Sequence, residues 1–496
     1  MLLFLALWQP ETVLDADRGK LTFYVSTCAV VTTIHLIVHS ERNWLRVDTL
    51  FLLSFLIVNI QWPAMILVDQ IVPEEQLTAF RLDKNLPRLI SLYMTYGTWL
   101  SAIGLTTWAL GYLIGYQQMN AGSRRRQHPF LAGPRKSLQS DEPKVITPRL
   151  VTIKGRFASH VIFLGLLIIF LMLVGPGFLF GETYSKVRAG GFVTLDGIAA
   201  YVHVLLVLFA IAVFSLEAYI LKRRYEAGER LGLADLLLNV GLCALLAYTL
   251  VFLLAGARSE VIQVMALASL IVGSCFRAIR LWEFFVAIAV GSLLFTIIGH
   301  VRSHGWGDLA LFLNDFNPWL PTVNLANSAI SVYLGVEVIE ERGGLFWGQT
   351  FLTNILSAVP LLTGWVSRTF EISSFDMSSA YYFARHLYGP NPHTGPGTGI
   401  VADSYVNFGV AGVAVCLAIY GCLCGICQSQ LLRANRFREF LVAAAFASLV
   451  FYMPRSSLFF QVQPVIWSLA LTYLLFRENS NRVQTGLSPR SGRHWH

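Results

Sequence analysis

The chain has 496 residues, of which 55% are hydrophobic and only 13% are charged, and its mean hydropathy is +0.59. Soluble domains carry about 25% charged residues, so this composition excludes an ordinary soluble globular fold. The formal net charge of +8 is not a nucleic-acid signal, because much of the positive charge lies in short segments between apolar runs, where it sets membrane orientation.

Repeated apolar runs of about 20 residues predict an all-α, polytopic membrane protein with about 11–12 spans. We expect spans at about 21–38, 50–70, 89–116, 159–181, 196–221, 234–256, 261–276, 281–299, 405–427, 439–454 and 462–476. Residues 1–8 are apolar but too short to span, and they lack the basic start and the cleavage site of a signal peptide. We therefore expect an interfacial helix there. The sequence contains no evident internal repeat.

Basic residues in the connecting segments predict the orientation. They are Arg42 and Arg46, the lysines and arginines of 117–157, Lys222, Arg223 and Arg224, Arg277 and Arg280, Arg433, Arg436 and Arg438, and Arg477 and Arg482. With these spans all of them fall on one side, which we predict to be cytoplasmic. The segment 71–88, with Arg81, Lys84 and Arg88, is an exception on the outer side.

This topology divides the chain into three parts. Residues 1–300 form an N-terminal transmembrane bundle that includes a basic cytoplasmic linker at 117–157. Residues 301–404 form a large extracytoplasmic loop, and residues 405–496 form the C-terminal spans and a cytoplasmic tail. Within the loop, the apolar stretch 345–365 is interrupted by polar residues and by Pro360, so we expect an interfacial or re-entrant helix rather than a span.

The end of the loop is rich in glycine and proline between residues 389 and 399, which argues against a regular helix there. Irregular backbone beside a span is tolerated where protein buries it or water reaches it, and such places often hold sites. An ordered outer loop without chemistry is the alternative. All seven cysteines lie within or at the ends of apolar spans, so we expect no disulfide framework, and we interpret Cys424 and Cys427 as packing residues.

Arginines at the outer ends of spans are the main functional candidates. An arginine at membrane level is costly unless it is paired or faces water. Converging guanidinium groups bind phosphate oxygens in pairs and stay charged, so they suit a diphosphate such as that of a polyprenyl-linked glycan. The candidate diphosphate-binding residues are Arg258, Arg302, Arg368, Arg385 and Arg455. Snorkelling to the interface and structural ion pairs remain open alternatives.

Transfer of a sugar from such a lipid also requires a base that accepts the proton of the attacking hydroxyl. Candidates in the loop are His393, Asp403, Asp376, Glu371 and Glu337, of which we select His393 and Asp403 as catalytic residues. A locally hydrogen-bonded histidine and an aspartate that caps the following span are the structural alternatives. The loop has no Asp-x-Asp cluster, so we predict neither a metal nor a cofactor.

Three segments of the second half resemble the bacterial Wzy-type oligosaccharide repeat-unit polymerases, relatives of the O-antigen ligases. Residues 256–259 (Gly-Ala-Arg-Ser) are similar to the family's Gly-Ser-Arg element, and 346–352 with Pro360 are similar to its aromatic-Gly segment. Residues 403–412 are similar to its acidic-x-Tyr-x-Asn-Phe-Gly entry to a late span, which makes Tyr405 and Asn407 candidate glycan-binding residues. An interface anchor and a helix-start hydrogen bond are the alternatives for these two. Ala257 and Asp403 depart from the expected Ser and Glu.

The resemblance implies a glycosyltransferase of the large multi-span class that joins undecaprenyl-diphosphate-linked repeat units into surface polysaccharide at the outer face of the inner membrane. Metal-independent transfer, a flippase and a chain-length regulator as partners, and no nucleic-acid partner are further implications. Two alternatives remain open. One is an O-antigen ligase, and the other is a transporter or flippase of lipid-linked glycan, although the sequence lacks the paired halves typical of transporters.

Overall fold

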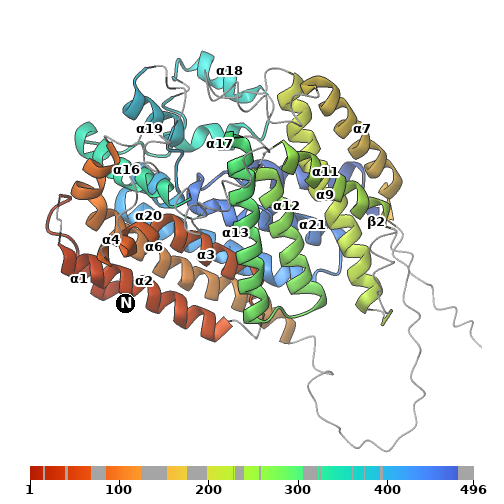
Figure 1. Ribbon diagram of the computed structural model, residues 1–496, viewed down its shortest axis with the longest axis horizontal. Helices are drawn as coiled ribbons and strands as arrows, with labels where there is room; N and C mark the ends of the chain where they lie inside the picture. Colours follow the sequence, from red (N-terminus) through yellow and green to blue (C-terminus); the bar gives the residue numbers. More distant parts are fainter. Residues whose placement is uncertain are drawn as a thin grey trace, which may run out of the picture.

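The computed structural model describes residues 1–14, 17–39, 43–68, 85–124, 153–175, 198–226, 228–229, 239–255, 258–304, 322, 325–359, 361–373, 375–390, 392 and 395–478. These residues form a helical bundle with one pair of two-residue strands (Figure 1). The strands β1 (Ile153–Lys154) and β2 (Arg477–Glu478) pair antiparallel. The protein is therefore an all-α, polytopic helical membrane protein, as its composition predicts.

The first part of the described chain contains ten helices, of which α1 and α4 are short. They are α1 (Leu2–Leu7), α2 (Arg18–His39), α3 (Val47–Asn59), α4 (Gln61–Leu67), α6 (Asn85–Arg124), α7 (Arg156–Val174), α9 (Ile198–Glu226), α11 (Val240–Leu254), α12 (Arg258–Ile271) and α13 (Leu281–His304). A π-helical turn, η2 (Val272–Phe276), extends α12.

The remaining helical elements follow from Asn327 onwards, and α20 is the longest of them. They are η4 (Asn327–Ala329), α16 (Ile330–Arg342), η5 (Gln349–Phe351), α17 (Leu352–Leu356), α18 (Leu362–Thr369), α19 (Ser379–Tyr388), α20 (Ile400–Arg433), α21 (Phe437–Ala447), η6 (Val450–Arg455) and α22 (Val462–Leu474). The stretch 345–365 forms short helices instead of one long one. In Figure 1, α17, α18 and α19 lie together at one end of the bundle.

Five helical segments of the described chain are long and apolar enough to cross a membrane, and the bent pair α3–α4 makes a sixth. The five are Arg18–His39, Arg156–Val174, Tyr201–Glu226, Ile400–Arg433 and Phe437–Arg455. Shorter apolar helices occupy Val240–Leu254, Glu260–Phe276, Leu281–Leu293 and Val462–Leu474. All of these segments coincide with predicted spans, and α6 covers the predicted span at 89–116.

The centre of the bundle is the pair α6–α20, which packs through glycines. Gly111 and Gly115 of α6 lie against the backbone carbonyls of Ala418 and Cys422 of α20. A Cβ added at Gly111 would lie 1.9 Å from the Ala418 oxygen, so only glycine permits this approach. Gly421 meets the backbone of α6 in the same way. Gly111 meets Ala418 and Gly115 meets Cys422, so residue numbers increase in the same direction along both helices. The two helices therefore run parallel and begin at the same end of the bundle.

Two basic residues that served to predict orientation are buried in the structure. Arg46 Nε lies 3.2 Å from Asp48 Oδ1. The second carboxylate oxygen of Asp48, Oδ2, lies 3.0 Å from His35 Nε2. Lys222 Nζ donates to the carbonyl oxygens of Leu431 and Leu432, at 3.0 Å each, near the C-terminal end of α20. A cation is favourable at that end of a helix, where carbonyl groups lack intrahelical partners.

Candidate functional site

Helix α20 is interrupted at Gly409, the glycine of the segment 403–412 that resembles a family motif. Gly409 has φ 66° and ψ −155°, a conformation available almost only to glycine. The break deprives nearby carbonyl groups of their helical donors. The backbone N–H groups of Phe346 and Trp347 donate instead to the carbonyl oxygens of Val406 and Asn407, at 3.0 and 3.1 Å. Backbone groups at membrane depth need such internal partners.

Side chains reinforce this connection between the segment 346–351 and α20. Thr350 Oγ1 donates to Asp403 Oδ1 at 2.9 Å, and Asn407 Nδ2 lies 2.6 Å from Thr350 Oγ1. Asn407 Nδ2 also donates to the Asp403 carbonyl at 2.7 Å, and its Oδ1 accepts from the Gly348 N–H at 2.8 Å. We call Asp403, Asn407, Thr350 and Gly348 the Asp403 junction. Two segments that resemble the family, more than fifty residues apart, thus form one unit.

The carboxyl group of Asp403 is fully buried and has no cation partner in the described part of the chain. The hydroxyl groups of Ser379 and Ser457 face it, but Oδ2 makes no hydrogen bond of good geometry with the described residues. Asp403 lies one turn inside α20, and its N–H donates to Gly399, so it is not the N-cap of the helix. This position suits a residue that holds segments together.

The two aromatic residues of the site differ in exposure. Tyr405 is only 7% exposed and packs edge-on against Tyr96, with ring centroids 6.0 Å apart. Trp347 is 76% exposed and has φ 52°, an uncommon conformation for a residue with a side chain. Nothing in the sequence indicates that conformation, because the hydrogen bonds to α20 impose it. Strained residues of this kind cluster at functional sites.

The predicted diphosphate-binding arginines lie on several elements. Arg258 is the first residue of α12, and Arg302 lies near the end of α13, but both side chains lie outside the described residues. Arg368 and Arg385 are exposed in the last turns of α18 and α19. The guanidinium carbon of Arg385 lies 5.5 Å from the centroid of the Phe375 ring.

Arg455 is the predicted arginine whose backbone the structure places beside the Asp403 junction. It ends η6 and is half-buried. The preceding Pro454 places its carbonyl oxygen 2.8 Å from an idealised Cβ on Gly399, the N-cap of α20. Ser457, two residues later, faces Asp403. The predicted base His393 lies outside the described residues.

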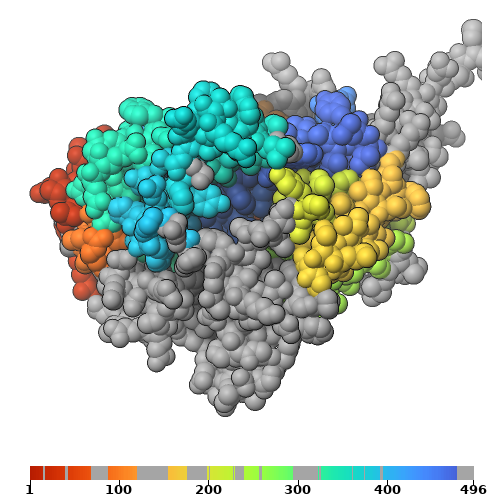
Figure 2. Space-filling view, turned by 90° about the horizontal axis from the view of Figure 1, so that it is seen from above, coloured from red at the N-terminus to blue at the C-terminus, as the bar shows by residue number. Residues whose placement is uncertain are grey.

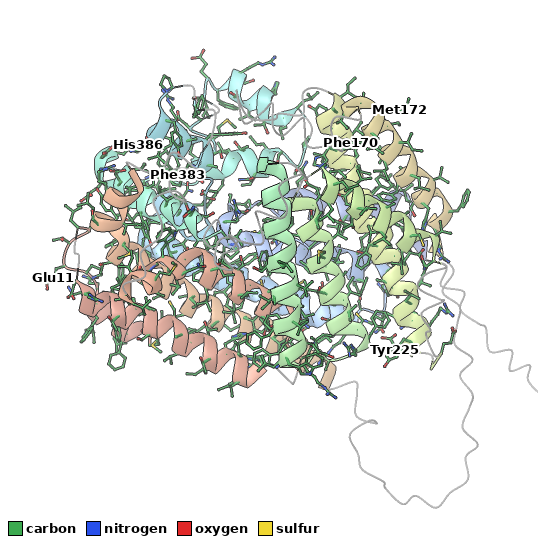
Figure 3. All side chains as sticks on the ribbon, in the orientation of Figure 1. Glu11, Phe170, Met172, Tyr225, Phe383 and His386 are labelled. Carbon is green, nitrogen blue, oxygen red and sulfur yellow. The ribbon has the colours of Figure 1, made fainter. Side chains whose placement is uncertain are left out.

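A second polar cluster connects α16, α19 and α6. Glu337 is buried, with Oε1 2.5 Å from Arg88 Nη2 and Oε2 3.6 Å from His386 Nε2. Burial raises the pKa of Glu337, but the contacts with His386 and Arg88 outweigh it and lower the pKa below its ordinary value. Contact with Glu337 raises the pKa of His386. Figure 3 shows His386 on α19, at the same end as α18.

Arg88 belongs to the segment 71–88, whose basic residues lie on the predicted outer side. In the structure its guanidinium group pairs with Glu337. The cluster also means that Glu337, one of the candidate bases, is already in contact with Arg88 and His386. Of the other candidates, Glu371 is exposed with φ 53°, and Asp376 is partly buried. Arg342 lies over the ring of Phe346, with 4.1 Å between the guanidinium carbon and the ring centroid.

Residues 238–478 match the family model described as O-antigen polysaccharide polymerase Wzy. The matched region contains every described element from α11 to β2 and therefore the whole Asp403 junction. Comparisons with curated proteins and with solved structures found no match.

Proposed function

We propose that this chain, whose residues 238–478 match the model of the O-antigen polysaccharide polymerase Wzy family, joins undecaprenyl-diphosphate-linked oligosaccharide repeat units into a longer polysaccharide. The reaction takes place on the outer side of the bacterial inner membrane. The observation that carries the proposal is the family match, which includes both segments that meet at the Asp403 junction.

In the proposed reaction, a hydroxyl group of one repeat unit attacks the anomeric carbon of the growing chain. The bond between that carbon and the diphosphate oxygen breaks, and the diphosphate leaves with the electron pair. Arg258, Arg302, Arg368, Arg385 and Arg455 are proposed to stabilise the charge on the leaving group. Their permanent charge makes the transfer independent of a divalent metal in this proposal.

His393 is proposed to accept the proton of the attacking hydroxyl. Asp403 and Asn407 are engaged in buried hydrogen bonds, which supports a positioning role for them in place of direct contact with the sugar. The hydrogen bonds of Asn407 hold the backbone of Trp347 and Gly348, and we propose that Trp347 and Tyr405 contact glycan. A flippase that delivers the repeat units and a chain-length regulator are the proposed partners.

The test is synthesis by the purified protein in proteoliposomes with lipid-diphosphate repeat units as the only substrate. A ladder of chain lengths, unchanged by a chelator of divalent metals, is the expected result. A single transfer to lipid A core without a ladder would indicate a ligase. Movement of labelled lipid across the bilayer without a new glycosidic bond would indicate a transporter, and either result would overturn the proposal.

A further inference from the structure

A cavity of about 980 Å³ follows the side of α20 that faces away from α6. Helices α21 and α22 form its other walls, and Gly348, Phe351 and Ile355 close one end. Gly348 belongs to the Asp403 junction, so the cavity begins directly below it. In Figure 2 the C-terminal segments, coloured blue, lie recessed between the cyan and yellow parts of the surface. We call this cavity the α20 groove.

The groove has the length of a membrane span. Its lining residues on α20 recur every three or four positions from Phe408 to Gln430 and thus form one stripe of the helix. The part after the break at Gly409, from Ala411 to Gln430, corresponds to about 28 Å of helix, close to the ~30 Å thickness of the hydrocarbon layer. The groove therefore reaches from the Asp403 junction to the opposite end of the bundle.

The lining carries no charged side chain, and apolar residues dominate it. Val415, Ile419 and Leu423 are 57%, 54% and 45% exposed, although α20 is the central helix of the bundle. Exposed apolar residues also occur on α7, for example Ile168 at 58%, but Ile168 does not line the groove. A concave, uncharged channel of this length is complementary to a long hydrocarbon chain.

We propose that the α20 groove binds the polyprenyl chain of the lipid-linked repeat unit and thereby places its diphosphate beside the Asp403 junction. This inference rests on the proposed function, because that function supplies a lipid-linked substrate. The continuity between groove and junction distinguishes this ligand from a bulk phospholipid. A polyprenyl diphosphate joins a chain long enough for the groove to the head group that reacts in the proposed function.

The first experiment compares two substitutions of the same kind. Ile419→Trp fills the groove, whereas Ile168→Trp enlarges an equally exposed isoleucine on α7, outside it. Because each buried methylene contributes to binding, loss of chain contacts should raise KM for the undecaprenyl substrate about tenfold or more, with kcat little changed. A geranyl-linked substrate, too short to reach Ile419, should show no difference between variant and wild type. Equal KM values for Ile419→Trp, Ile168→Trp and wild type would overturn the proposal.

The second experiment does not depend on polymer synthesis. A photoreactive undecaprenyl diphosphate without sugar is cross-linked to the protein in liposomes, and labelled peptides are identified by mass spectrometry. We expect labelling of residues 411–430. Unlabelled undecaprenyl diphosphate should displace this label, whereas phosphatidylethanolamine should not. Equal displacement by phosphatidylethanolamine would show a general lipid surface and reject the proposal. Specific labelling in a protein that makes no polymer would support the groove and count against the proposed function alone.

Discussion

Asp403 shows how one buried residue joins distant segments of this site. Its carboxylate accepts from Thr350, and its carbonyl accepts from the side chain of Asn407, so removing Thr350 takes one hydrogen bond from a buried carboxylate. The family resemblance suggests glutamate at this position. The structure offers a reason for the shorter side chain, because Thr350 Oγ1 already lies 2.9 Å from Asp403 Oδ1 and an extra methylene would need additional space.

Thr350→Val keeps the shape of the side chain but removes the hydroxyl group that connects Asp403 and Asn407. An unsatisfied buried acceptor costs about 1–3 kcal/mol, so the thermal midpoint in detergent should fall and polymer synthesis should fall with it. Thr350→Ser should retain both. Thr353→Val, on α17 outside the junction, serves as the control. A Thr350→Val protein with wild-type stability and activity would show that the junction is not required.

Arg258 is the residue for which we predict the largest effect on turnover. If its guanidinium stabilises the leaving diphosphate, Arg258→Ala should lower kcat by roughly 100- to 1000-fold while the protein still folds. Arg258→Lys should recover only part of the activity, because an ammonium cannot make the two-pronged contact. Arg277→Ala, beyond the other end of the α12–η2 helix, is the matched control. Normal chain synthesis by a well-expressed Arg258→Ala protein would refute the assignment.

At the scale of elements, the break in α20 determines the site. At the break, the carbonyl groups of Val406 and Asn407 accept from the N–H groups of Phe346 and Trp347, and the groove begins beside the same segment at Gly348. A regular helix would satisfy those carbonyl groups internally, and the junction would lose its backbone bonds. The conformation of Gly409 is therefore the condition on which the site depends.

Gly409→Ala tests that condition. The nearest atom to an added Cβ would be Leu345 Cδ1 at 3.9 Å, so space is available and the backbone conformation alone opposes the change. We expect a cost of about 1–3 kcal/mol and loss of polymer synthesis. Gly343→Ala, also at positive φ with open space but at the end of α16, should lower stability without abolishing synthesis. Similar activities for the two variants would contradict the role assigned to the break.

The helices could be predicted from the sequence because an apolar run about as long as a membrane is thick indicates a span whatever it packs against. The pairing of α6 with α20 also has a sequence signal, since Gly111 and Gly115 match the spacing of Gly421 and Gly425. The break could not be predicted, because donors in a distant segment stabilise it. For the same reason the sequence does not single out Thr350 as a site residue, although it indicates its partners Asp403 and Asn407. Arg46 is buried beside Asp48, which also contacts His35, and a hydropathy pattern cannot reveal such contacts between polar side chains.

At the scale of the molecule, two arrangements agree with the predicted orientation. The C-terminal ends of the parallel helices α6 and α20 lie at one end of the bundle, and the sequence directly after each helix carries many of the basic residues. At the other end, Arg88 in the first turn of α6 contacts Glu337 of α16, a helix within the predicted outer loop. The positive-inside rule therefore predicts that the first end is cytoplasmic and that the loop is extracytoplasmic.

Single cysteines in a background without the seven native ones test this orientation directly. Gly364→Cys lies on α18, where an added Cβ meets open space, and Glu229→Cys lies exposed near Arg224 after α9. In intact spheroplasts a membrane-impermeant maleimide should label residue 364 and not residue 229, and permeabilisation should make both reactive. The opposite pattern would place the Asp403 junction in the cytoplasm. A polymerase of outer-face lipid-linked glycan would then be impossible with this topology, so the experiment tests the orientation on which the proposed function depends.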